Sequence, residues 1–295
     1  MSELLAALPE GWPNREYSRE IEAAGLRWHV QVLGEVGVAK PVVLLLHGTG
    51  AASHSWAGLA PLLATRYTVV IPDLPGHGFT ELAPAAQCSL QGMSKAVASL
   101  LDALGVAPSI IVGHSAGAAI AASLCLRGSC NPEFVVSING AMLPFGRAAA
   151  PVFSRAARFL SELPVFPQLI ALHAVPRKPV LRMLRQTGSQ LPEEAVRWYR
   201  HVVGKPGHVA GTLRMMANWD LPQLEKNLDR LSPPRHLLVC AADQVVDPQQ
   251  GRELASRLPG ATLQTLPDLG HLGHEEDPPR FAAIILALAE GRTEP

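Results

Sequence analysis

Short apolar runs alternate with segments of helical period along much of the chain. Runs of consecutive apolar residues are typical of buried strands, and apolar residues three or four apart are typical of helices. The predicted strands are Leu26–Val32, Val42–Leu46, Tyr67–Ile71, Ile110–Val112, Phe134–Ile138, His236–Cys240 and Ala261–Leu266. The predicted helices are Leu90–Leu104, the alanine-rich segment after Ser115, Gln249–Leu258 and Pro278–Glu290. This alternation predicts an α/β fold with a mostly parallel, doubly wound sheet.

The pattern changes after Asn139-Gly140, where short helical segments are broken by prolines. The alternation of apolar runs with helical segments resumes near Pro233-Pro234. The sequence therefore predicts an α/β core from residues 1–140 and 232–295, with a helical cap inserted as residues 141–231. Only Leu26–Val32, which alternates between apolar and polar residues, is expected to run antiparallel.

Composition fits this picture, because 295 residues with 48% hydrophobic side chains can bury a large core. The net charge of zero hides an asymmetry. Residues 141–214 hold eleven Lys or Arg against three Asp or Glu, so the rest of the chain is equally acidic. A basic segment can steer an anionic ligand or hold that part against a membrane surface, and a solvated helix face is the alternative.

The four cysteines are scattered without paired spacing, which favours small core residues over a metal site or a disulfide framework. The first twenty residues contain acids and prolines and no basic segment before an apolar run, so we expect no secretory signal and a cytoplasmic location. No apolar run approaches the roughly 20 residues of a membrane span. The histidines lack the spacing of metal ligands, so we expect no metal and no cofactor.

The most informative stretch is Gly113-His114-Ser115-Ala116-Gly117, between an apolar run and an alanine-rich helix. A serine between glycines at such a sharp turn is a nucleophile elbow. The glycines prevent collisions in the turn, and the strained backbone lifts the Ser115 hydroxyl above the sheet. The N–H of Ala116 lies at a helix N-terminus, where it can stabilise an oxyanion.

A serine nucleophile needs a base and a group that orients the base. Asp243 and His271 follow the last two predicted strands, at the edge where α/β sheets carry their functional loops. Asp247 is an alternative acid, although it can instead cap the following helix. His274 is an alternative base, and the Gly270-His271 context favours His271.

The second oxyanion donor should come from the loop His47-Gly48-Thr49-Gly50, where we expect the N–H of Thr49. This loop lacks the GK[ST] ending of a phosphate-binding loop, and we expect no nucleic-acid partner. Trp56 is a candidate substrate contact, but packing under the loop is favoured. His114 could shape the substrate pocket or hydrogen-bond nearby loops.

With these motifs in order, the chain resembles the α/β-hydrolase superfamily over nearly its whole length. Several segments resemble more specifically the BchO-type magnesium chelatase accessory proteins of bacteriochlorophyll biosynthesis. These segments are WPNRE, HGTGAASHSW, GHSAGAAIA, NGAMLPFG and, above all, GHVAGTLRMMANWDL from Gly207 to Leu221. Ala241-Ala242 stands before Asp243 where the superfamily commonly has glycine.

The resemblance implies a role linked to insertion of magnesium into protoporphyrin IX, without fixing a reaction. Implied partners are a small-molecule substrate or tetrapyrrole, and magnesium chelatase or other pigment-pathway enzymes; peripheral membrane contact stays open. We expect an esterase-like serine hydrolase. The alternatives are a non-catalytic accessory protein that binds a tetrapyrrole or the chelatase, and other chemistry on the same triad, such as C–C cleavage.

Overall fold

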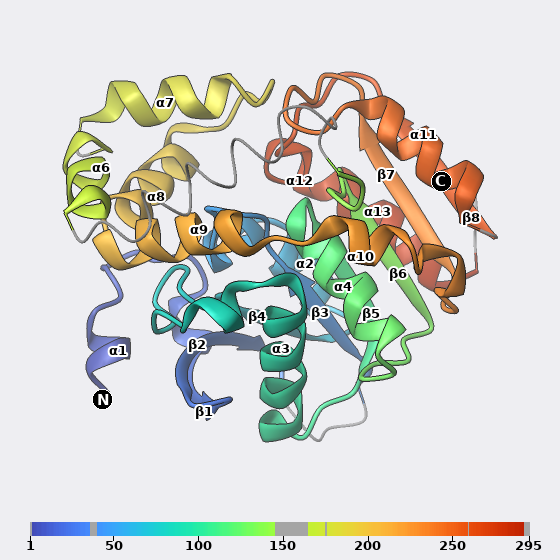
Figure 1. Cartoon of the computed structure of the whole chain (residues 1–295), viewed down its shortest axis with the longest axis horizontal. Coiled ribbons are helices and arrows are strands. Elements are labelled where there is room, and N and C mark those ends of the chain that lie inside the picture. The colour runs from blue at the N-terminus through green and yellow to red at the C-terminus, as the bar shows by residue number, and fades with distance from the viewer. Residues whose placement is uncertain (1, 36–39, 145–164, 175, 259, 292–295) are drawn as a thin grey trace.

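The computed structural model describes residues 2–35, 40–144, 165–174, 176–258 and 260–291 (Figure 1). Within these ranges, eight strands form one sheet in the order β1-β2-β4-β3-β5-β6-β7-β8. Strands β3 to β8 are parallel, whereas β2 pairs antiparallel with both β1 and β4. The strands are β1 Ser18–Ala23, β2 Leu26–Leu33, β3 Val42–Leu46, β4 Thr68–Pro72, β5 Pro108–His114, β6 Phe134–Ile138, β7 Arg235–Cys240 and β8 Ala261–Leu266.

Helices cover both faces of this sheet, each with its own apolar cluster. One cluster joins the sheet to α3 Leu90–Leu104, α4 Ala116–Leu126 and α11 Pro248–Arg257. The other joins it to α2 Leu59–Ala64 and α13 Pro278–Ala289. The predicted α/β, doubly wound architecture is confirmed, including the antiparallel β2.

Between β6 and β7 the described elements are all helical. They are α6 Phe166–Ala174, α7 Arg177–Arg185, α8 Glu193–Val203, α9 Pro206–Asn218 and α10 Leu221–Glu225. Figure 1 shows α6, α7 and α8 gathered beyond one end of the sheet, with α9 and α10 leading back toward β7. We call α6–α10 the insertion helices. The boundaries of a separate cap at 141–231 stay a prediction, and residues 145–164 lie outside the described part of the chain.

Prolines stand at the starts of these helices. Pro176 and Pro192 are the N-cap residues of α7 and α8, and Pro206 is in the first turn of α9. Proline fits there because the first N–H groups of a helix have no intrahelical partner. The prolines therefore divide the segment into short helices, as the sequence predicts.

Two elements at the N-terminal end complete the fold, α1 Glu3–Ala6 and the 3-10 turn Arg15–Tyr17. Further 3-10 turns are Ser53–Trp56, Ala85–Cys88 and Leu228–Arg230, and α12 is the short helix Gly273–Glu276. Among the described residues no helix has the length and apolar character needed to cross a bilayer.

Candidate active site

Ser115 lies at the turn between β5 and α4, with φ at 52° and ψ at −117°. A residue other than glycine rarely adopts this backbone, so the turn is strained. The neighbouring glycines are required by close packing: a Cβ on Gly113 would lie 2.5 Å from the backbone N of Ala118, and one on Gly117 2.1 Å from the backbone O of Leu46. The geometry is that of the predicted elbow.

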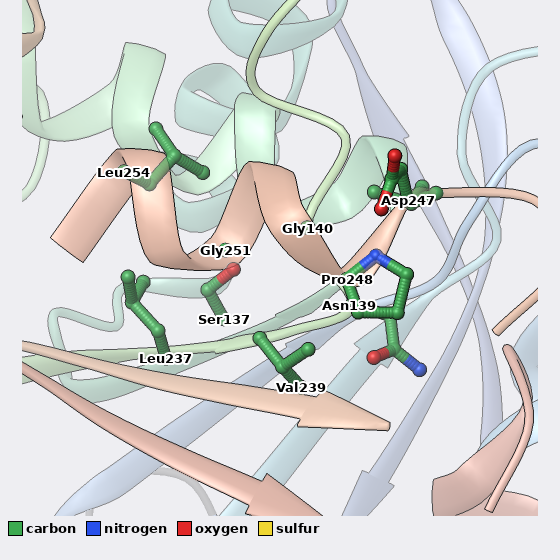
Figure 2. Close-up of a pocket in the computed structure, with 10 residues that line it drawn as sticks. Ser137, Asn139, Gly140, Leu237, Val239, Asp247, Pro248, Gly251 and Leu254 are labelled. Carbon is green, nitrogen blue, oxygen red and sulfur yellow. The ribbon is translucent and has the colours of Figure 1, made fainter. Parts of the chain in front are cut away.

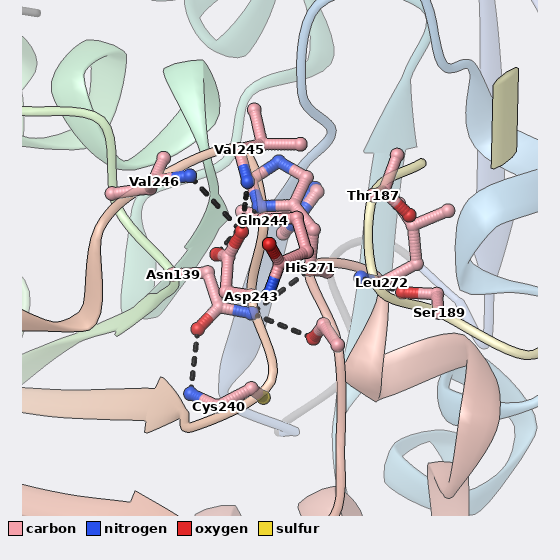
Figure 3. A network of polar contacts seen from close by, with 12 residues as sticks. Asn139, Thr187, Ser189, Cys240, Asp243, Gln244, Val245, Val246, His271 and Leu272 are labelled. Carbon is pink, nitrogen blue, oxygen red and sulfur yellow. Dashed lines mark hydrogen bonds and ion pairs between the residues drawn. The ribbon is translucent and has the colours of Figure 1, made fainter. Parts of the chain in front are cut away.

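Asp243 and His271 meet on the loops that follow β7 and β8. The Nδ1 atom of His271 is 2.7 Å from Oδ2 of Asp243, and the His271 and Asp243 side chains are 7% and 1% exposed. The other carboxylate oxygen accepts backbone N–H bonds from Val245 and Val246 (Figure 3). A buried carboxylate held this way orients the imidazole, with Nδ1 protonated and Nε2 free to accept a proton.

His114 connects the elbow to this pair. Its Nε2 donates to the backbone O of His271 at 2.9 Å, and the two rings are 4.7 Å apart. Ser115 therefore follows directly on a residue that contacts His271. Burial, with the nearby His274 and His271, holds the pKa of His114 well below its usual value, so His114 is a neutral donor.

The loop after β3 passes over Ser115. A Cβ on Gly48 would lie 2.9 Å from Nδ1 of His114 and 3.0 Å from the Cβ of Ser115, so a larger residue would have to displace one of these side chains. Thr49 is exposed, and its hydroxyl contacts the sulfur of Met215 at 3.6 Å. Ala116 is the first residue of α4, where backbone N–H groups lack intrahelical partners. The two expected oxyanion donors thus belong to segments that both adjoin Ser115.

The alternative acid and base have other partners. Asp247 accepts from the N–H of Gln249 at 2.9 Å and is the N-cap residue of α11, the structural role weighed from the sequence. His274 is fully buried, and its Nε2 contacts the Ser55 hydroxyl at 2.8 Å. Burial lowers the pKa of His274 to about 3. Trp56 is also fully buried, with its ring 4.5 Å from that of His274, which agrees with the packing interpretation.

The buried carboxyl of Glu275 lies next to His274 and links it to helix α8. One oxygen of Glu275 accepts from the Tyr199 hydroxyl on α8 at 2.6 Å and from the Ser55 hydroxyl at 2.7 Å. Burial raises the pKa of Glu275 to about 8, against the lowering effect of the two hydroxyls. Glu275 therefore joins an insertion helix to the core as a carboxyl that is largely protonated near neutral pH.

Two further contributors to the site have no local sequence motif. Asn139, at the end of β6, donates to the backbone O of His271 at 2.9 Å and accepts from the N–H of Cys240 at 2.8 Å. Thr187, between α7 and α8, accepts at its backbone O from the N–H groups of His271 and Gln244, both at 3.2 Å (Figure 3). All four hydrogen bonds join residues far apart in the chain, the smallest separation being the 57 positions between Thr187 and Gln244.

The described residues line a small cavity and a larger hollow near these elements. The first, between β6, β7 and α11, has a volume of about 10 Å³, enough for one water molecule and no substrate (Figure 2). The second is a hollow of about 430 Å³ on α7 and α8, lined by Arg177, Glu193, Glu194, Val196, Arg197 and Arg200. Within the described residues, no group of three or more His, Cys, Asp or Glu is arranged to hold a metal ion.

Comparison with known proteins places this geometry in a family. The model of the alpha/beta hydrolase family matches residues 43–284, from the first parallel strand to the last helix. The chain belongs to the α/β-hydrolase family. Its likeness to the magnesium chelatase accessory group is also confirmed, because it is 36% identical over 285 residues to the magnesium-chelatase 30 kDa subunit of Rhodobacter capsulatus. That match covers 97% of this chain and 99% of the relative.

Solved structures support the same fold for this α/β-hydrolase. An alpha/beta hydrolase fold protein from Burkholderia ambifaria has a TM-score of 0.76 at 24% identity, over 92% of this chain and 97% of that chain. The enol-lactonase from Burkholderia xenovorans LB400 has a TM-score of 0.73 at 21% identity, over 92% of this chain and 100% of that chain. At these identities the likeness concerns the fold alone.

Proposed function

We propose that this α/β-hydrolase cleaves an ester or related carbonyl bond through an acyl-enzyme on Ser115. The observation that carries the proposal is the buried 2.7 Å contact between Asp243 and His271, reached from the strained elbow through His114. A serine, a carboxylate and an imidazole, in this order along the chain, are the nucleophile, orienting group and base of α/β-hydrolases that use serine.

In the proposed reaction, Nε2 of His271 takes the Ser115 proton as the oxygen attacks the carbonyl carbon. The N–H groups of Ala116 and Thr49 stabilise the oxyanion, and His271 then gives its proton to the leaving group. Water, deprotonated by His271, then attacks the acyl carbon. The bond to the Ser115 oxygen breaks, the acid product leaves, and His271 returns the proton to that oxygen. Asp243 stays ionised throughout and stabilises the imidazolium.

We further propose that this hydrolase acts in bacteriochlorophyll biosynthesis, in an accessory role to magnesium chelatase. The support is the 36% identity to the subunit from Rhodobacter capsulatus over nearly the whole chain. The insertion helices would form the cap, within the predicted limits 141–231, and would bind the substrate or tetrapyrrole. The basic excess of residues 141–214 suits carboxylate groups such as porphyrin propionates.

A second candidate is a non-catalytic accessory protein that binds a tetrapyrrole, the chelatase or another pigment-pathway enzyme. The name of the relative, a chelatase subunit, favours it. Peripheral membrane contact belongs to this candidate as well, because α6 exposes Leu169 and Leu172 next to the basic helix α7. The cytoplasmic location stays a prediction of the sequence.

One experiment separates the two candidates. The protein is treated with a fluorophosphonate probe, and Ser115→Ala is compared with Ser129→Ala, which changes an exposed serine just after α4. We expect labelling of the wild type and of Ser129→Ala, and none of Ser115→Ala. Loss of a working nucleophile lowers turnover about 10⁴- to 10⁶-fold, so pigment formation should also fail in cells carrying only Ser115→Ala. Normal pigment in those cells would favour the binding protein.

A further inference from the structure

One face of α9 covers the loop that carries the expected oxyanion donor. His208, Thr212 and Met215 are three or four positions apart, so they lie on the same side of the helix. The sulfur of Met215 contacts the Thr49 hydroxyl at 3.6 Å, and the methyl of Thr212 lies 3.7 Å from where a Cβ on Gly50 would be. The helix thus contacts two successive residues of this loop.

His208 makes the directional contacts of this face. Its Nε2 is 3.1 Å from the backbone O of Gly50, and its Nδ1 is 3.0 Å from the backbone N of Gly78. Since Gly78 can only donate from its N–H, Nδ1 accepts and Nε2 carries the proton that goes to Gly50. Burial, with the nearby His77 and His47, holds the pKa of His208 well below its usual value. The ring is a neutral bridge between two loops.

The helix itself has little freedom to shift against the core. A Cβ on Gly211 would lie 2.0 Å from the backbone O of Gly76, so the backbones of α9 and of the loop after β4 are in direct contact. Lys205, the N-cap residue of α9, donates to the backbone O of Gly78 at 2.9 Å. The ring of His208 is therefore presented to Gly50 from a rigid support.

The loop that His208 contacts, residues 47–50, has a glycine on each side of Thr49 and so has more backbone freedom than most loops. Gly48 and Gly50 flank Thr49, and Gly50 has φ at +76°, a conformation that glycine adopts without strain. Gly48 also lies against Ser115, with only 3.0 Å from its would-be Cβ to that of the serine. Within the loop, the backbone O of Gly48 accepts from the N–H of Ala51 at 3.2 Å and contacts Nδ1 of His47 at 2.8 Å. The bond from His208 to Gly50 adds an anchor from outside the loop, directly after Thr49.

We infer that His208 is a positioning residue for the oxyanion loop: its hydrogen bond to Gly50 holds Thr49 where its N–H can reach the oxyanion formed at Ser115. The inference rests on the proposed function. It predicts an effect on the transition state, so kcat falls while KM changes little, because an oxyanion donor matters most after the nucleophile has attacked. His208 itself does not touch the substrate.

The test compares His208→Phe, which keeps a ring without hydrogen bonds, with His208→Gln, which retains a donor and an acceptor. His173→Phe, at an exposed histidine on α6, is the matched control. Removing one oxyanion donor costs about 10²- to 10³-fold in kcat. His208→Phe displaces the donor without removing it, so we expect part of that loss. The maximal fluorophosphonate labelling rate, and kcat on a p-nitrophenyl ester, should each fall by at least about tenfold. The half-saturating concentrations should stay nearly constant, and His208→Gln should recover most of the rate.

Hydrogen exchange supplies a readout that does not need catalysis. In His208→Phe, the amides of segments 47–52 and 73–80 should exchange faster than in the wild type, with His208→Gln in between. A wild-type labelling rate with unchanged exchange in His208→Phe would overturn the inference and leave the proposed function intact. If the wild type is not labelled at all, the proposed function fails. In that case, unchanged amide exchange in His208→Phe would still overturn the inference about His208.

Discussion

Asn139 has a left-handed backbone, with φ at 46°, where β6 ends. Its amide donates to the backbone O atoms of Gly270 and His271, and its side-chain O accepts from the N–H of Cys240. One side chain therefore joins the strand end before Asp243 to the loop of His271. Asparagine tolerates a left-handed backbone better than most residues. It therefore meets both needs of this position, the backbone conformation and a side chain that both donates and accepts hydrogen bonds.

We expect Asn139→Asp to destabilise the protein by about 2 kcal/mol or more, because a carboxylate would face two carbonyl oxygens in a buried site. The same change should slow fluorophosphonate labelling of Ser115 by displacing His271. Urea unfolding and labelling rates measure the two effects, with Asn131→Asp at an exposed position as the control. Unchanged stability in Asn139→Asp would show that the two donated hydrogen bonds contribute little.

At the scale of elements, the connector between α7 and α8, residues Thr187–Gln190, holds the loops of Asp243 and His271 together. Besides the two bonds to the backbone O of Thr187, the Ser189 hydroxyl accepts from the N–H of Leu272 at 2.8 Å. Gly188 has φ at +84°, and a Cβ there would lie 2.0 Å from the backbone O of Ala242. The insertion thus contributes backbone contacts to the loops of Asp243 and His271.

Gly188→Ala should therefore push the connector away from the Asp243 loop. We expect a loss of about 2–4 kcal/mol in the free energy of unfolding, from the strained backbone and the collision together, and slower labelling of Ser115. Gly128→Ala is the matched control, because Gly128 has φ at +69° with nothing within 4 Å of its would-be Cβ. That variant should lose only about 1 kcal/mol and be labelled at the wild-type rate. Equal losses in both variants would contradict the proposed contact.

At the scale of the whole molecule, six histidines are buried and have a lowered pKa. Burial is the largest cause of the lowered pKa in each, and it lowers the pKa of His54, His77 and His274 to about 3. The others are His47, His114 and His208. As pH falls below 6.5, the ordinary histidine pKa, the unfolded chain therefore binds protons at these rings before the folded chain does.

Acid should therefore unfold the protein at a mild pH. Each such histidine contributes stability that is present above its unfolded-state pKa and is lost as pH falls toward the folded-state pKa, by up to about 1.4 kcal/mol per pH unit. Glu275, whose pKa is raised to about 8, acts in the opposite direction and offsets about one of these histidines. The remaining effect still approaches the whole stability of a typical domain, about 5–15 kcal/mol, within one or two pH units. We expect the free energy of unfolding, measured in urea from pH 8 to pH 5, to fall steeply below pH 6.5.

His54→Phe provides the matched test, because neither ring nitrogen of His54 has a hydrogen-bond partner among the described residues. The variant should be more stable than the wild type at pH 5.5. The slope of its free energy of unfolding against pH should correspond to the uptake of about one proton fewer on unfolding. A slope of less than one proton in the wild type between pH 5 and pH 6 would contradict this account.

Most of the sheet was predictable from local patterns, and the exceptions have physical reasons. Strand β1 was not predicted because its sequence, SREIEA, is mostly polar. It lies at the edge of the sheet with no fully buried residue, so no apolar run is needed. Helix α2 was not predicted either, because it is six residues long and includes Pro61. Its stability comes from packing against α13 in the second apolar cluster.

The sequence by itself determined those parts of the candidate site that depend on neighbours in the chain. The Ser115 turn needs glycine two residues before and after, and the acid and base must follow parallel strands, so local patterns and chain order suffice. Only the tertiary structure decided which distant residues hold these parts: Asn139, Thr187 and, on our inference, His208. Their side chains and carbonyls act on loops far away in the chain, and such contacts leave no periodicity or spacing to read.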